Sequence, residues 1–126
     1  ELWRQLRGPA FFSIAGRRPD PLFVSVLLHG NEDSGWQAIQ SVLRRHRGAL
    51  LPRPLLLFVG NIAAARDRLR SLPGQEDYNR AWPGTDHPET PTAHLLREVF
   101  ELVRPRSVAE AVAARTSPAA SIRCSG

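Results

Sequence analysis

The chain has 126 residues, of which 42% are hydrophobic and 23% are charged, and its formal net charge at pH 7 is +5. This length suffices for one compact domain but not for two, and the composition is ordinary for a soluble globular protein. No apolar run approaches the roughly 20 residues that span a bilayer, which excludes a membrane-spanning helix. The first residues also lack the apolar stretch and cleavage site of a signal peptide.

The positive charge comes from arginine, since the sequence contains no lysine. The arginines are scattered along the chain without interleaved aromatic residues, so we do not expect nucleic acid as a partner. Without a membrane-spanning run, we expect no membrane partner either. A few arginines directed into a pocket for a small anionic substrate are the more economical use of this charge. The single cysteine, Cys124, cannot form an internal disulfide, which favours a cytoplasmic protein. The oligomeric state cannot be read from the sequence.

The first half of the chain predicts two strands, a helix and a further strand. The run "FFSIAG" (11–16) is typical of a short strand, and residues 22–28, apolar except for Ser25, predict a strand that is buried on both faces. From Ser34, "SGWQAIQSVLRRH" has apolar residues at helical spacing and arginines on the other side, which indicates an amphipathic helix. The segment "LPRPLLLFVGN" (51–61) predicts another buried strand.

The second half is expected to hold less regular structure. Residues 62–70 form a short helix or helical turn, and residues 71–90 form a long loop of the length that usually serves function. A second amphipathic helix follows, with Thr92 as its N-cap and Pro105 at its end. This order of elements predicts an α/β fold, in which helices cover the faces of a sheet.

Ligands of such folds gather at the carboxyl ends of the strands. Both apolar strands end in polar residues there, and the first of these clusters contains His29 and Glu32. Imidazole and carboxylate are good zinc ligands, and a catalytic zinc site needs three of them and an open position. The plainer alternative is a strand-end histidine bonded to the backbone, with Glu32 placed favourably near a helix N-terminus.

Three further residues suit an anionic substrate. Asn79 and Arg80 lie side by side in "DYNR", and an arginine can hold a carboxylate in a bidentate grip. Arg70 lies nearby in sequence, where its charge can stabilise a developing oxyanion. The alternative for each of the three is a solvated loop residue.

The three motifs together resemble one family. "HGNE" (29–32), "GNIAAARDRLR" (60–70) and "DYNRAWPG" (77–84) resemble, in this order, the motifs of the zinc-dependent succinylglutamate desuccinylase/aspartoacylase family. That family is a branch of the metallocarboxypeptidase-like zinc hydrolases. The resemblance covers about residues 9–105, and Ile62 stands where the family usually has proline.

The resemblance implies a zinc-carboxypeptidase-like mixed sheet flanked by helices, incomplete at its C-terminus. It implies that His29 and Glu32 are two of the three ligands of one zinc ion, while Asp77 orders the loop. The activity implied is hydrolysis of an amide bond in an N-acyl amino acid or a related carboxylate-bearing substrate. A metallocarboxypeptidase that removes a C-terminal residue is the alternative with the same carboxylate grip.

The resemblance also implies roles for the three substrate-facing residues. Arg70 matches the arginine that polarises the scissile carbonyl, and Asn79 and Arg80 match the pair that binds the free carboxylate of the substrate. A zinc-bound water with its pKa lowered towards ~7 would attack the amide carbonyl.

The pattern breaks in the last part of the chain. The family's third zinc ligand, a histidine in a D-x-H-N segment, is due around residues 108–115, where the sequence has Ala113, Ala114 and Arg115. The later glutamate that acts as general base is missing too. His87 and His94 are the histidines that remain downstream, and neither follows a strand.

We therefore interpret residues 1–108 as the N-terminal part of a zinc hydrolase catalytic domain and residues 109–126 as an atypical tail, truncated or frame-shifted. The chain alone is then expected to be catalytically incomplete. The alternative outside the enzymes is a non-catalytic α/β remnant that binds an anion.

Overall fold

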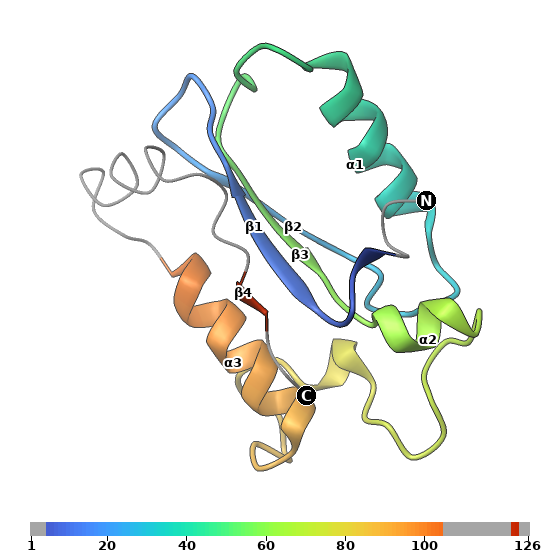
Figure 1. Cartoon of the computed structure of the whole chain (residues 1–126). Helices are drawn as coiled ribbons and strands as arrows, with labels where there is room; N and C mark the ends of the chain where they lie inside the picture. The colour runs from blue at the N-terminus through green and yellow to red at the C-terminus, as the bar shows by residue number, and fades with distance from the viewer. Residues whose placement is uncertain (1–4, 105–121, 124–126) are drawn as a thin grey trace.

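The computed structural model describes residues 5–104 and 122–123 of the chain (Figure 1). The sheet is built from β1 (Ala10–Ile14), β2 (Leu22–Val26) and β3 (Leu55–Val59), with the two-residue β4 (Ile122–Arg123) at one edge. The strand order among the described residues is β2-β3-β1-β4. Since β2 runs parallel to β3 and β1 runs antiparallel to it, the sheet is mixed, and the predicted α/β class is confirmed.

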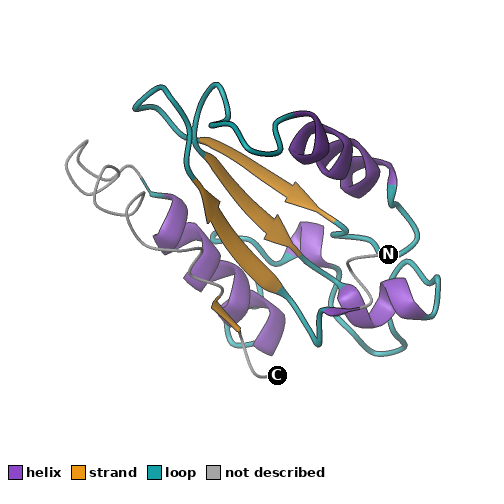
Figure 2. Cartoon of the chain, turned by 45° about the horizontal axis from the view of Figure 1, so that its top comes forward, coloured by secondary structure: helices purple, strands orange, loops and turns teal. Residues whose placement is uncertain are grey.

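The central strand β3 is buried because helices cover both faces of the sheet (Figure 2). On one face, α1 (Ser34–Arg45) packs its buried Trp36 against side chains that include Leu57 and Val59. On the other face, α3 (Pro91–Val103) packs against Phe58. Neighbouring residues of β3 thus enter opposite cores, as the two-residue period of a strand requires, and both helices and the burial of β3 are confirmed as predicted.

The prediction of a fully buried strand over residues 22–28 is correct only in part. β2 stops at Val26, and Leu27 adopts a left-handed backbone conformation with φ 55°. β2 is also an edge strand of the described sheet, and Leu22 at its start is 44% exposed. The faces of β2 are partly covered, since Val24 and Phe23 pack against the two cores, but among the described residues no strand pairs with its outer edge.

The helix α3 begins two residues earlier than predicted. Its N-cap is Thr90, not Thr92, and the Thr90 Oγ1 accepts a hydrogen bond from the Ala93 N–H at 3.2 Å. Pro91 then occupies the first helical position, where its fixed φ and missing N–H carry no penalty. The helix ends at Val103, and the predicted stop at Pro105 lies outside the described residues.

The segment between β3 and α3 has the predicted character. It contains the short helix α2 (Ile62–Arg66) and one turn of 3-10 helix, η2 (Tyr78–Arg80), and is otherwise irregular. The positions expected for the third zinc ligand, residues 108–115, lie outside the described part of the chain. Within the tail, β4 pairs antiparallel with the start of β1.

Candidate functional site

The carboxyl ends of β2 and β3 lie together, as the sequence predicts. The Gly60 N–H donates to the Val26 carbonyl at 3.0 Å, and the Asn61 N–H donates to the Leu27 carbonyl at 2.7 Å. These bonds continue the parallel pairing beyond the strands and bring the two polar clusters into contact. His29 and Asn61, one from each cluster, are 4% and 1% exposed, which makes them the buried polar residues of the described chain.

The imidazole of His29 lies between two carboxylates. Its Nε2 is 2.9 Å from Asp77 Oδ1, and its Nδ1 is 3.2 Å from Glu32 Oε2. An ionised carboxylate only accepts hydrogen bonds, so Nε2 carries a proton that it donates to Asp77. In a neutral imidazole Nδ1 then presents a lone pair to the Glu32 carboxylate, and two acceptors face each other. A proton or a metal cation between Nδ1 and Glu32 resolves this arrangement.

The loop that carries His29 and Glu32 is held tightly against α2. The Glu32 N–H donates to the His29 carbonyl at 3.1 Å, which closes the turn between them. Gly30 packs so closely that a Cβ there would lie 2.3 Å from the Ala65 backbone nitrogen. The Gly30 N–H also donates to the Arg70 carbonyl at 3.1 Å, so this loop and the Arg70 segment are fixed to each other.

Asp77 is held in its ionised form. Burial, the largest single influence, raises the pKa of its carboxyl group, but the other influences together outweigh it and the pKa lies below the ordinary value of 3.8. The lowering comes from the hydrogen bond of the Asn79 N–H, from the His29 hydrogen bond and charge, and from the charge of Arg70. Asp77 is therefore a permanent acceptor for His29 near neutral pH.

Arg70 contacts the carboxylate of Asp77, as His29 does. Its Nη2 is 3.6 Å from Asp77 Oδ2, and its side chain is 62% exposed. The structure thus brings His29 and Arg70 to Asp77, while Glu32 contacts the other ring nitrogen of His29. Because most of the Arg70 side chain faces solvent, the guanidinium retains donors for a bound molecule.

Asn79 and Arg80 join this group through the backbone of η2. The Asn79 N–H donates to Asp77 Oδ1 at 2.8 Å, the oxygen that also accepts from His29. The Arg80 N–H donates to the Asp77 carbonyl at 2.9 Å. Both side chains are exposed, and Arg80 forms no ion pair with another described residue. They are available for a ligand on the solvent side of Asp77.

Two interactions of this site were missed by the sequence analysis. Asp77, assigned there to loop ordering, is also the partner of His29, and histidines that bind metal commonly donate their second N–H to such a carboxylate. The second interaction is a pair of amides, in which Asn61 Nδ2 donates to Gln75 Oε1 at 2.8 Å. Asn61 Oδ1 also caps α2 by accepting from the Ala64 N–H at 3.2 Å. No local pattern in the sequence indicates the partnership of Asn61 with Gln75.

The side chains of His29 and Glu32 have the spacing of two ligands of one zinc ion. Zinc lies about 2.0–2.2 Å from histidine nitrogen and carboxylate oxygen, so two such ligands of one ion lie roughly 3–3.5 Å apart. The 3.2 Å between His29 Nδ1 and Glu32 Oε2 falls in this range. Asp77 cannot complete the set because it contacts the opposite nitrogen of the ring. Consistent with this, no group of three metal-binding side chains occurs within residues 5–104.

The two downstream histidines do not supply the third ligand. His87 lies in the loop beside Glu89, with 3.7 Å between Nδ1 and Oε1, and its side chain is 71% exposed. His94 lies on α3 and lines a cavity of about 850 Å³ together with Asn61, Gln75 and Tyr78. His29, Glu32 and Arg70 do not line this cavity, so it adjoins the candidate site through Asn61 and Gln75 and not through the proposed zinc ligands.

Comparison of the chain with protein-family models, with curated proteins and with solved structures found no match. No helix in the described part of the chain combines the length and the apolar character that crossing a membrane requires.

Proposed function

We propose that His29 and Glu32 are two ligands of a zinc ion in a hydrolase site that cleaves an amide bond of an N-acyl amino acid or a related carboxylate-bearing substrate. The observation that supports this most strongly is the geometry of His29. Its Nε2 is held by Asp77, and its Nδ1 lies 3.2 Å from Glu32 Oε2, a separation that two ligands of one cation can have. The resemblance of three motifs to the succinylglutamate desuccinylase/aspartoacylase family points to the same ligands and to a zinc-carboxypeptidase-like fold.

Each residue then has a chemical role. When bound, zinc supplies a water that is acidic enough to act as a nucleophile near neutral pH. Asp77 fixes the orientation and tautomer of His29. The exposed guanidinium of Arg70 stabilises the negative charge that develops on the carbonyl oxygen of the substrate. Asn79 and Arg80 bind the free carboxylate and so place the amide beside His29 and Glu32.

Two ligands hold zinc weakly, and within the described residues no third metal-binding side chain joins His29 and Glu32. We therefore expect weak zinc binding and no turnover by this chain as it stands. The substrate assignment can be tested by binding instead of hydrolysis.

The test measures binding of N-acetylleucine and N-acetylleucinamide to the full chain by calorimetry, with and without zinc. The two ligands differ in the free carboxylate, so we expect binding of the acid, at least tenfold weaker binding of the amide, and loss of this difference in Arg80→Gln. Equal binding of the two ligands would contradict the carboxylate assignment. Preference for the acid without any influence of zinc would favour the non-catalytic anion-binding alternative instead.

The deacylase and carboxypeptidase alternatives differ in what lies on the other side of the amide. A leucyl-leucine dipeptide in the same experiment separates them. Tighter binding of N-acetylleucine than of the dipeptide supports the deacylase, and the reverse order supports the carboxypeptidase.

A further inference from the structure

The end of the sheet opposite to the candidate site is strongly basic. Here the turn 15–21, which joins β1 to β2, lies against the loop 46–54, which leads into β3. The Arg17 N–H donates to the Leu51 carbonyl at 2.8 Å, and the Arg18 N–H donates to the Pro52 carbonyl at 3.2 Å. Together with the last turn of α1 these segments form what we call the arginine end. It carries Arg17, Arg18, Arg44, Arg45, Arg47 and Arg53.

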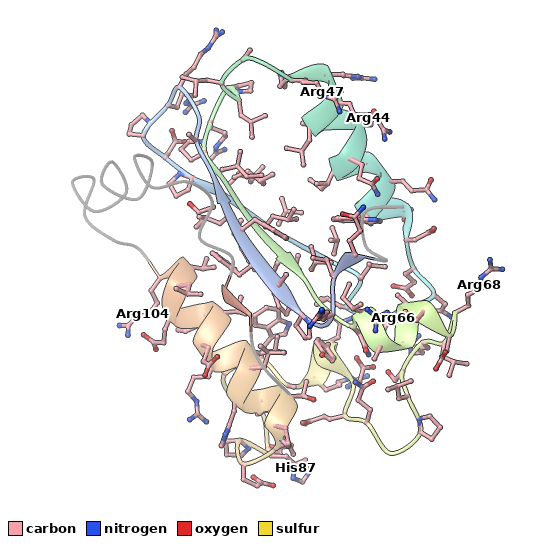
Figure 3. All side chains as sticks on the ribbon, in the orientation of Figure 1. Arg44, Arg47, Arg66, Arg68, His87 and Arg104 are labelled. Atoms are coloured by element: carbon pink, nitrogen blue, oxygen red, sulfur yellow. The ribbon has the colours of Figure 1, made fainter. Side chains whose placement is uncertain are left out.

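The net positive charge of the described chain is concentrated at this end. Its single carboxylate, Asp20, lies 3.1 Å from both Arg18 and Arg53. The other four arginines form no ion pair with another described residue. The remainder of residues 5–104 contains seven arginines and nine acidic residues, so the positive excess is local. Figure 3 shows Arg44 and Arg47 at this end, well away from Arg66 and Arg68 near the candidate site.

The arginine end also exposes aliphatic side chains. Five large hydrophobic residues are exposed in the described chain, and three of them, Leu22, Val42 and Leu50, belong to this end or adjoin it. Leu50 is the most exposed, at 54%, and lies in the loop between Arg47 and Arg53. Gly48, with φ 81°, turns the chain just before it. Arginine and leucine thus occupy the same projecting loop.

We propose that the arginine end binds the surface of a membrane that contains anionic phospholipids. Clustered guanidinium groups are attracted by the negative surface of such a bilayer, and exposed leucines gain from contact with its apolar boundary. A nucleic-acid duplex offers phosphates but gives Leu50 no apolar partner. The turn 15–21 and the loop 46–54 contain no Phe, Tyr or Trp that could stack on unpaired bases.

This proposal departs from the expectation that the chain has no membrane partner. That expectation rested on the absence of a membrane-spanning run, and the scattered positions of the arginines in the sequence gave no sign of a basic surface. Folding brings the turn 15–21 and the loop 46–54 together, and the clustering appears only then. The proposal concerns a different part of the molecule from the zinc site and does not depend on it.

The test is co-sedimentation of the full chain with vesicles of phosphatidylcholine alone or mixed with about one-third phosphatidylglycerol, in about 0.1 M salt. We expect binding to the anionic vesicles only, weakened at least tenfold in about 0.5 M salt. The triple variant R44E/R45E/R47E should bind at least tenfold more weakly. The matched control R68E/R97E/R104E has the same net charge and should stay within about twofold of the wild type. Circular dichroism verifies that both variants are folded.

The contribution of the leucine is tested with Leu50→Ser, which leaves the charge unchanged. We expect binding to anionic vesicles to fall several-fold, while any binding to a short DNA duplex stays the same. Equal losses in the two triple variants would overturn the proposal, because overall charge and not the arginine end would then govern binding. Duplex binding as tight as vesicle binding, with no effect of Leu50→Ser, would overturn it in favour of nucleic acid.

Discussion

The two ends of the parallel strands β2 and β3 are chemically opposite. At the carboxyl ends, the polar groups of His29 and Asn61 are buried and bonded to partners from the loop that precedes α3. At the amino ends, most of the charged groups are exposed and of one sign. The same pair of strands thus supports a compact polar network at one end and a basic surface at the other.

Because of this difference, we expect substitutions at the carboxyl ends to change stability and substitutions at the amino ends to change binding. Buried polar groups depend on each other, since removing one leaves its partner without a hydrogen bond. Exposed charges contribute little to stability, because solvent and salt screen them. The carboxyl ends should therefore be sensitive in unfolding experiments, and the arginine end should be tolerant.

The largest effect is expected for Gly30→Ala at the carboxyl end. The added Cβ would lie 2.3 Å from the Ala65 nitrogen and 2.4 Å from the Ala64 carbonyl carbon, so backbone must move. We expect a loss of about 3 kcal/mol in the free energy of unfolding, measured by urea denaturation. The control Gly48→Ala, at the arginine end, has open space around its Cβ but φ 81°, and should lose about 1 kcal/mol. Equal losses of stability in Gly30→Ala and Gly48→Ala would contradict the proposed difference between the two ends.

A smaller effect is expected for Asp77→Asn, which weakens charge-assisted hydrogen bonds from His29 and the Asn79 N–H. We expect the variant to be about 1 kcal/mol less stable than the wild type at neutral pH. Because the pKa of Asp77 is lowered in the folded state, this difference is full above about pH 5. It shrinks as the pH falls below the ordinary value of 3.8 and through the folded-state pKa. Thermal unfolding across this pH range measures it.

Asp20 provides a second test of the difference between the two ends. The pKa of its carboxyl group is also lowered, by a hydrogen bond with its own backbone and by Arg18 and Arg53. Asp20 lies at the arginine end, and its side chain is 45% exposed. We expect Asp20→Asn to change stability less than Asp77→Asn at every pH. A larger effect of Asp20→Asn would show that the arginine end is a structural network.

The smallest effect is expected for Arg47→Gln. Arg47 is exposed and forms no ion pair with another described residue. The free energy of unfolding should stay within about 0.5 kcal/mol of the wild type, measured by urea denaturation. A loss well above this would mean that Arg47 has a structural partner.

Much of the fold could be predicted because its signals are local. The strand β3 is recognisable by its apolar run, and the helices α1 and α3 by the helical spacing of their apolar residues, such as Trp36 in α1. In each case the pattern reflects which faces of the element are buried. The meeting of the carboxyl ends of β2 and β3 could also be predicted, since parallel strands end at the same edge of a sheet. The bond of the Asn61 N–H to the Leu27 carbonyl confirms that the two strand ends meet.

The remainder depends on contacts between distant residues. The His29–Asp77 bond spans 48 positions, and the Asn61–Gln75 pair joins two loops without any periodic pattern. The edge position of β2 depends on which strands pair, which its apolar composition does not reveal. The arginine end likewise forms only when two separate loops pack together.

The most direct test of the proposed zinc site is a calorimetric titration of the full chain with zinc, repeated for His29→Gln, Glu32→Gln and the control His87→Gln. We predict weak binding of one ion to the wild type and to His87→Gln, and loss of that binding in both site variants. Binding that survives in His29→Gln and Glu32→Gln would contradict the assignment of these two residues as zinc ligands.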